Sequence, residues 1–226
     1  MAAGTLPSRT AGEEEYLQAI WTLADEGGPV ISARLAEFLR ISPASVSEMV
    51  HRLERDGLAR LNDRKEIGLS PTGEELARSI VRRHRLVERM LTDLLGYEWW
   101  KTHDEAERLE HAISPEMERR LIERLGDPET CPHGNPMPGT ARRVWSQPLD
   151  QAPIGEPVVL ERIPDQFEHE PGFLEYVDSQ GLRPGTTFRL LDRSPDGLVV
   201  EVAGARRTIR ADCGAKVWVR PAAAAS

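Results

Sequence analysis

Hydrophobic positions near the start of the chain recur at the three- and four-residue spacing of amphipathic helices. The first series is Tyr16, Leu17, Ile20, Trp21 and Leu23, and it ends at the helix breaker Gly27-Gly28-Pro29. A short second helix follows, with Ser32 as its expected N-cap. A third helix begins at Ser42-Pro43, because serine caps helices and proline suits the first helical position, and it runs to about Asp56-Gly57.

Two short extended runs, Leu58 to Leu61 and Glu66 to Leu69, flank a polar turn and predict a small hairpin. Three further helices are expected, over 70–96, 101–113 and 114–126. The stretch 127–153 is rich in proline and glycine, which predicts a linker with some local order. Short β-rich runs follow (158–160, 188–191, 198–202 and 217–219) and predict a small β-barrel or sandwich.

Composition indicates an ordinary soluble protein, since 39% of the 226 residues are hydrophobic and 29% are charged. No run approaches the ~20 apolar residues of a membrane span. The N-terminus also lacks the apolar core of a secretory signal, so we expect a cytoplasmic protein with no membrane partner. Two cysteines, Cys131 and Cys213, are too few for a disulfide scaffold. The net charge of -8 argues against nucleic acid as the main partner unless the charge is unevenly distributed.

The charge is in fact uneven, because cations outnumber acids between Arg34 and Lys65. Two helices, a third beginning at Ser42-Pro43 and a charged hairpin make a winged helix-turn-helix, whose third helix would enter the major groove by its N-terminal end. The candidate base-contacting residues are Pro43, Ala44, Ser45, Ser47 and Glu48, and the candidate phosphate-contacting residues are Arg34, Arg52, Arg64 and Lys65. Any three-helix unit with surface arginines would look similar, so both interpretations stay open at this point.

Histidines and carboxylates gather on two consecutive predicted helices. Glu107, Glu110 and His111 share one helix face if the helix is regular, so they can point at one ion. His84 and Glu88 lie four residues apart on the preceding helix, and His103 lies four before Glu107. The alternative is a solvated face of alternating charge, which is common on helices.

The chain resembles the diphtheria-toxin-repressor family of metal-dependent transcriptional regulators. The resemblance covers Glu14 to Gly139 and rests on motifs in a fixed order: Glu14-Glu15-Tyr16-Leu17, Ala44-Ser45-Val46-Ser47, Leu53-Glu54-Arg55-Asp56-Gly57-Leu58, Leu69-Ser70-Pro71-Thr72-Gly73, Arg83-His84-Arg85-Leu86, His103-Asp104-Glu105-Ala106, Glu110-His111 and Cys131-Pro132-His133-Gly134-Asn135-Pro136. The tail resembles the SH3-like domain of the same family, also seen in ferrous-transport accessory proteins, mainly through 181–185.

The resemblance implies a mainly α protein with a small β domain, in three domains: a winged helix-turn-helix (1–76), a helical metal-binding and dimerisation domain with the linker (77–149), and an SH3-like barrel (150–226). It implies an activating metal site of Glu15, His84, Glu107, Glu110 and His111. It implies a second site of Glu88 and His103, joined by Cys131, His133 and an acid such as Asp165 or Glu168. Leu91, Leu94, Leu95, Trp99 and Trp100 are either a dimer interface or core.

Two departures from the family's iron-responsive members concern the choice of metal. In those members a methionine stands at the position of Glu15 and a cysteine at that of Glu107, whereas both are carboxylates here. Oxygen ligands suit Mn²⁺, while Fe²⁺ accepts the same donors with higher affinity. The resemblance therefore favours the manganese-responsive branch, with Fe²⁺ as the alternative.

The expected function is a Mn²⁺-dependent homodimer that binds a palindromic double-stranded operator and represses or activates metal-transport genes. Two rivals are a metalloenzyme and a metal-independent winged-helix regulator. We expect no enzyme, because the sequence contains no nucleophile motif, separate general base or glycine-rich phosphate loop.

Overall fold

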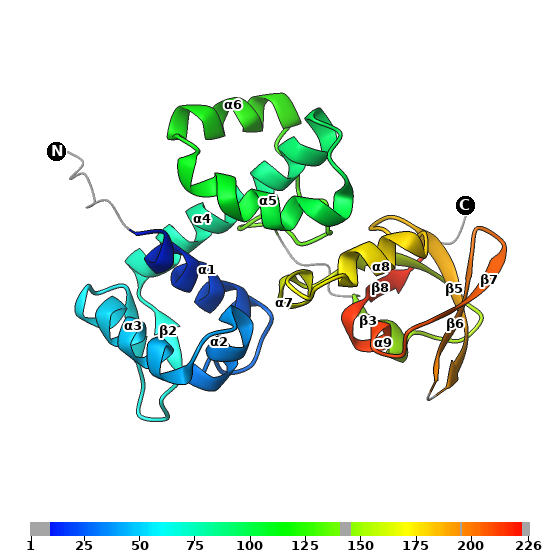
Figure 1. The fold of residues 1–226 in the computed structure, drawn as a ribbon, viewed down its shortest axis with the longest axis horizontal. Coiled ribbons are helices and arrows are strands. Elements are labelled where there is room, and N and C mark those ends of the chain that lie inside the picture. Colours follow the sequence, from blue (N-terminus) through cyan, green and yellow to red (C-terminus); the bar gives the residue numbers. More distant parts are fainter. Residues whose placement is uncertain (1–9, 141–145, 195, 223–226) are drawn as a thin grey trace. The chain divides into compact units, whose positions relative to one another are not determined.

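The structure, a computed structural model, describes residues 10–140, 146–194 and 196–222. The chain divides into two compact units, Met1–Arg82 and Arg83–Ser226, and each is described by itself. The described residues confirm the predicted architecture of a helical N-terminal part followed by a small antiparallel sheet (Figure 1).

The first unit is a winged helix-turn-helix. It contains α1 (Ala11–Asp25), α2 (Ser32–Leu39), α3 (Pro43–Arg55), the antiparallel strands β1 (Ala59–Leu61) and β2 (Ile67–Leu69), and the start of α4 (Pro71–Arg89). Ser42 caps α3, as expected, because its side chain accepts a hydrogen bond from the backbone N–H of Ser45. The expected cap of α2 is wrong: Ile31 occupies the N-cap position with no side-chain bond, and Ser32 is the first helical residue.

One apolar core joins these elements, because the residues at helical spacing face inward. Leu17, Ile20, Leu35, Val46 and Leu53 are fully buried members of this cluster. Gly73, near the start of α4, permits a close approach to the hairpin, since a Cβ there would lie 2.0 Å from the Leu58 carbonyl oxygen. The core therefore fixes α3 and the hairpin as one rigid body.

The second unit begins with the C-terminal part of α4. A π-helical turn, η1 (Met90–Leu94), continues it, and then come η2 (Trp99–Lys101), α5 (Thr102–Leu109), η3 (Glu110–Ala112) and α6 (Pro115–Leu125). The expected helix over 101–113 is therefore interrupted, since its last turn is a 3₁₀ helix. Gly126 ends α6 in the left-handed conformation.

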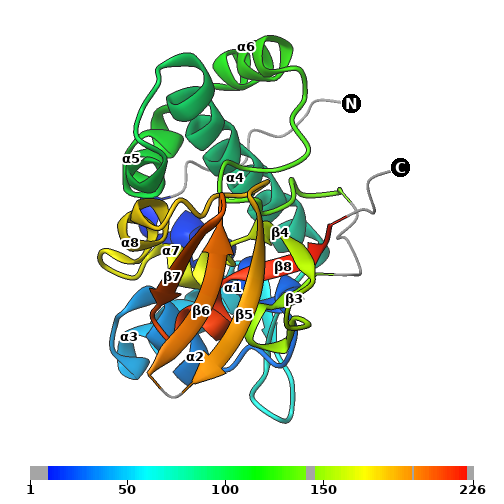
Figure 2. The same ribbon diagram turned by 90° about the vertical axis from the view of Figure 1, so that its right-hand side faces the viewer.

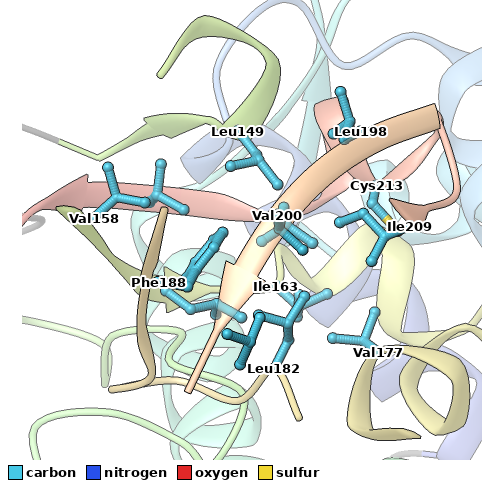
Figure 3. Packing of buried hydrophobic residues seen from close by; sticks show 14 of the residues in the cluster. Leu149, Val158, Ile163, Val177, Leu182, Phe188, Leu198, Val200, Ile209 and Cys213 are labelled. Carbon is cyan, nitrogen blue, oxygen red and sulfur yellow. The ribbon is translucent and has the colours of Figure 1, made fainter. Parts of the chain in front are cut away.

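The C-terminal part of this unit is a six-stranded antiparallel sheet of order β3-β8-β4-β5-β6-β7 (Figure 2). Its strands are β3 (Gln147–Pro148), β4 (Pro157–Arg162), β5 (Thr187–Ser194), β6 (Gly197–Val202), β7 (Ala205–Ile209) and β8 (Trp218–Pro221). Short helices lie between them: η4 (Leu149–Gln151), α7 (Asp165–Glu168), α8 (Phe173–Ser179) and α9 (Cys213–Lys216). Side chains of the sheet and of α8 meet in one core, where Phe188, Val200 and Val177 lie together (Figure 3).

The segment expected as a linker is largely built into the second unit. Cys131, His133 and Asn135 are buried, and Thr130 forms a β-bridge with Pro136. Gly134 has a φ of +90°, and a Cβ there would lie 2.0 Å from the Glu161 carbonyl oxygen. Glycine at this position therefore allows the segment to pack closely against β4. Proline and glycine content alone does not distinguish such a packed segment from a linker. Residues 141–145 of the expected linker lie outside the described residues.

Candidate metal centre

Four buried side chains from three elements of the second unit converge on one point. His84 and Glu88 lie four residues apart on one face of α4, His103 comes from α5, and Glu168 is the last residue of α7. One nitrogen or oxygen atom of each lies within 4.8 Å of the others. We call these four residues the buried cluster.

The distances within the buried cluster are those of donors that surround a common position. His84 Nε2 lies 3.3 Å from Glu88 Oε1 and 3.2 Å from His103 Nδ1. His103 Nδ1 lies 2.8 Å from Glu168 Oε2. Two imidazole nitrogens at this distance cannot both carry a proton directed at the other.

A hydrogen bond outside the buried cluster determines which nitrogen of His84 faces inward. Its Nδ1 lies 2.5 Å from Glu110 Oε2, so the Nδ1–H donates to that carboxylate. Nε2 is then the nitrogen that faces Glu88. A carboxylate that holds the distal N–H of a histidine is the usual second partner of a metal-binding imidazole.

Cys131 and His133, from the segment that was expected to be a linker, lie beside the buried cluster. His133 Nδ1 lies 3.1 Å from Glu88 Oε1 and 3.3 Å from Glu168 Oε2. Its Nε2–H donates to the Trp99 carbonyl oxygen at 3.2 Å, so Nδ1 is the nitrogen that faces the two carboxylates. Glu88, Cys131 and His133 form a second group of donors within 4.8 Å of one another.

The acid supplied by the β domain is Glu168, not Asp165. Asp165 accepts two hydrogen bonds of 2.9 Å from the fully buried Arg85. Glu168 is held differently, because the side-chain amide of Asn135 donates to its Oε1 at 2.6 Å and leaves Oε2 facing His103. Arg162 in turn donates to Asn135 Oδ1 at 3.0 Å.

Electrostatics show that the carboxylates of the buried cluster need positive charge beside them. Burial disfavours a charged His84, but Glu88 and Glu110 outweigh this effect and raise its pKa to about 10. Burial also opposes ionisation of Glu168, yet His133 lowers its pKa to about 2. The carboxylates therefore stay ionised at neutral pH, and either protons on the imidazoles or a metal cation must balance them.

The donor set fits a divalent metal ion. Among the residues that the structure describes, Glu88 Oε2 and His133 Nδ1 are buried polar atoms without a hydrogen-bond partner of acceptable geometry. Such atoms are rare in folded proteins unless a bound water or ion satisfies them. Imidazole and carboxylate donors suit Mn²⁺, Fe²⁺ and Zn²⁺. Burial raises the pKa of Cys131 to about 12, which disfavours its thiolate.

Of the residues expected in the activating site, the structure brings His84, Glu110 and His111 together and places Glu107 beside His103. The α5 helix ends at Leu109, so Glu107, Glu110 and His111 do not keep the face of a regular helix. Glu110 turns to His84, whereas Glu107 Oε1 lies 3.6 Å from His103 Nε2. The side chain of His111 is 31% exposed, 3.6 Å from Glu110 Oε1. Glu15 lies exposed on α1 in the first unit, and its metal role stays a prediction.

The expected base-contacting residues are all exposed near the N-terminus of α3: Pro43, Ala44, Ser45, Ser47 and Glu48. Arg64 and Lys65 are exposed at the turn of the hairpin. The other two expected phosphate contacts have partners within the unit. Arg34 donates to the Gly27 carbonyl oxygen at 2.8 Å, and Arg52 pairs with Glu13 at 2.9 Å.

The five residues weighed as dimer interface or core differ in burial. Leu91 and Trp99 are buried, while Leu94 and Leu95 are 40% and 65% exposed and Trp100 is half-buried. Tyr97 and Met117 are also exposed, and α6, which carries Met117, contacts η1. We call Leu94, Leu95, Tyr97 and Met117 the apolar patch.

Sequence reasoning did not assign roles to four residues around the buried cluster: Arg85, Asn135, Arg162 and His169. His169 lies 3.1 Å from His103, through its Nδ1 and the Nε2 of His103. Neighbouring positions gave the only hint, since Arg85 and Asn135 fall inside motifs and His169 adjoins Glu168. Their roles depend on contacts between segments distant in sequence.

Three family models match the chain in the order of its domains. The N-terminal DNA-binding domain of iron-dependent repressors matches residues 10–67, and their metal-binding and dimerisation domain matches 70–139. The FeoA domain matches 147–221. Across the described residues, no helix is long and apolar enough to cross a membrane.

Individual proteins support the same relationship. The iron-dependent repressor IdeR of Mycobacterium leprae is 35% identical over 199 residues, which cover 83% of this chain and 86% of the relative. A diphtheria toxin repressor from Corynebacterium efficiens is 47% identical over 128 residues, 57% of this chain and 56% of that protein. A solved structure of a manganese-dependent transcriptional repressor with manganese has a TM-score of 0.82 at 31% identity, and covers 93% of this chain and 100% of its own.

Proposed function

Because the chain belongs to the diphtheria toxin repressor family of metal-dependent transcriptional repressors, which are DNA-binding proteins and not enzymes, we propose that Mn²⁺ is its activating ion. We propose further that the Mn²⁺-loaded chain binds a palindromic operator as a homodimer and represses metal-transport genes. The observation that carries metal dependence is the donor set of the buried cluster, two imidazoles and two carboxylates. The choice of Mn²⁺ rests on the carboxylates Glu15 and Glu107, which stand where the iron-responsive members have a methionine and a cysteine. Fe²⁺ is the second candidate, because it accepts the same donors and the relatives named above include iron-dependent repressors.

The bound ion supplies two positive charges to a buried group of ionised carboxylates. Glu88 and Glu168 come from α4 and α7, and without a cation their charges oppose the approach of these elements. His84 and His103 lose their protons to bind, so binding is linked to proton release. Asn135 and Glu110 hold Glu168 and His84 in the orientation that binding requires.

The DNA-binding surface is proposed from the exposed N-terminal end of α3 and from the hairpin. Pro43, Ala44 and Ser45 are small enough to let the helix approach base edges, and serine hydroxyls can hydrogen-bond bases or phosphates. Arg64 and Lys65 are placed to contact phosphates beside the groove. Arg34 and Arg52 would first have to release partners within the unit, so we give them a smaller share of the binding free energy.

The dimer is proposed from the apolar patch. Four large apolar side chains are exposed on η1, on the turn that follows it and on α6, and such a patch marks an interaction surface in a soluble protein. A second copy of the chain is the partner we propose, because the matching family domain is a dimerisation domain. Two α3 helices related by a two-fold axis would read two half-sites of a palindrome.

The experiment that tests this function selects binding sites from a random duplex library with the full chain. Parallel selections contain Mn²⁺, Fe²⁺ without oxygen, or a chelator. We expect one palindromic site, recovered with Mn²⁺ and absent with chelator. Stronger recovery with Fe²⁺ would place the chain with the iron-responsive repressors, and equal recovery in chelator would refute metal control.

A further inference from the structure

We propose that His103, Glu107 and His169 form a second, solvent-facing site for a divalent metal ion, which we call the outer triad. The inference rests on the proposed metal site at the buried cluster, because the two sites share the ring of His103. His103 Nε2 lies 3.1 Å from His169 Nδ1 and 3.6 Å from Glu107 Oε1. His169 Nδ1 lies 3.5 Å from Glu107 Oε1, so the three donor atoms form a nearly equilateral triangle.

The chemistry of the outer triad differs from that of the buried cluster. Two imidazoles and one carboxylate on one side of an ion leave its remaining coordination positions open. The side chains of His169 and Glu107 are 24% and 45% exposed, so water or an exchanging ligand reaches those positions. In the buried cluster, by contrast, His84 and Glu88 are almost completely buried. The outer triad is therefore suited to an ion that exchanges readily with solvent.

The ring of His103 presents one nitrogen to each site. Nδ1 faces Glu168 of the buried cluster at 2.8 Å, and Nε2 faces His169 of the outer triad at 3.1 Å. Each nitrogen also has a hydrogen-bond acceptor when it carries the proton, namely Glu168 Oε2 for Nδ1 and His169 Nδ1 for Nε2. Both tautomers of the neutral ring are thus supported by the surrounding residues.

The shared ring makes the two sites compete. A neutral imidazole carries one proton and offers one lone pair, so His103 binds only one ion at a time. When the proton is on Nδ1, it is donated to Glu168 and Nε2 is available to the outer triad. When the proton is on Nε2, Nδ1 is available to the buried cluster. An ion in either site therefore lowers the affinity of the other.

The test measures Mn²⁺ binding to the full chain by following free Mn²⁺ with electron paramagnetic resonance. The variants are His169→Ala, Glu88→Gln and the control His51→Ala, whose histidine is exposed on α3 in the first unit. We expect His169→Ala to weaken one binding phase by about 10-fold or more and to leave the tight phase as strong or stronger, because competition for His103 ends. His51→Ala should reproduce the wild-type isotherm.

The two proposals fail in different ways. A His169→Ala isotherm identical to the wild type would overturn the outer triad. A tight phase unchanged by Glu88→Gln would instead refute the buried cluster as the tight site, whatever His169→Ala does. Crystals equilibrated with enough Mn²⁺ to saturate the weaker phase add a direct readout. An anomalous peak within bonding distance of His169 Nδ1 and Glu107 is expected, and a map without it would also overturn the outer triad.

Discussion

Asn135 shows how a side chain outside a proposed metal site can orient one of the proposed ligands. Its amide donates to Glu168 Oε1 and to the Ile163 carbonyl oxygen, and its own oxygen accepts from Arg162. All three contacts are buried, so no water can replace them without a local rearrangement. The carboxylate of Glu168 thereby points Oε2 at His103.

Replacing Asn135 by Ala should therefore weaken Mn²⁺ binding without removing a ligand. Loss of a second partner of this kind costs about 10- to 100-fold in metal affinity. Isothermal titration of the tight phase checks the expectation. Asn62→Ala is the control, because Asn62 organises the hairpin turn of the first unit through its own side-chain hydrogen bonds. Equal affinity of Asn135→Ala and the wild type would show that Glu168 is positioned by other contacts.

The two thiols should be inert in the native protein. Burial raises the pKa of Cys213 to about 12, and burial followed by the charge of Glu88 does the same for Cys131. At pH 8 only roughly one thiol in ten thousand would then be ionised, and the thiolate is the reactive form. The metal-free chain should release no prompt colour from a disulfide reagent at pH 8, and two equivalents after denaturation. Prompt reaction of one thiol, assigned with Cys213→Ser, would contradict this.

At the scale of elements, the sequence predicts those features that depend on residues close to one another in the chain. The winged helix-turn-helix was predictable because caps, breakers and apolar spacing act within a few residues, as at Ser42 and Pro43. The change from α5 to a 3₁₀ turn at Glu110 was not predictable from spacing, and it redirects Glu110 to His84. The proline- and glycine-rich composition of residues 127–140 likewise does not reveal that the segment is packed. Gly134 is required there by a contact with β4, which is distant in sequence.

Gly134 and Gly139 offer a matched pair for testing that segment. Both have positive φ, +90° and +95°, but only at Gly134 would a Cβ meet backbone atoms. Gly139→Ala should cost about 1 kcal/mol for the left-handed conformation alone. Gly134→Ala should cost clearly more, because the segment must move away from Glu161, and it should also weaken Mn²⁺ binding by displacing His133. Denaturant unfolding and a Mn²⁺ titration measure both effects, and equal results for the two variants would refute the required close approach.

At the scale of the whole molecule, the sequence indicated the ligands but not their division between sites. Every residue of the buried cluster was among the candidates. Helical spacing and family motifs indicated His84, Glu88 and His103, and the resemblance offered Glu168 as one of two possible acids. His84 was expected with Glu107 and Glu110. It contacts Glu110, but Glu107 lies beside His103, and the donors grouped with His84 are Glu88, His103 and Glu168. That division depends on how α4, α5 and α7 meet, which no spacing within one helix encodes.

The dimer is the property of the whole molecule that a single substitution can test. Leu95 is 65% exposed, so Leu95→Glu should leave the fold of the chain unchanged while it places a charge in the apolar patch. A charge buried without a partner at an interface opposes association. We expect a monomer by light scattering, an unchanged circular dichroism spectrum and retained Mn²⁺ binding. Operator affinity should fall, because a monomer presents only one α3 helix to an operator that has two half-sites.

Ile154→Glu is the control for this substitution, because Ile154 is a similarly exposed aliphatic residue, at 53%, outside the apolar patch. It should leave both the oligomeric state and the operator affinity at wild-type values. A dimeric Leu95→Glu would show that association uses another surface. A monomeric Leu95→Glu with full operator affinity would separate association from DNA binding, and would remove the reason to expect a palindromic site.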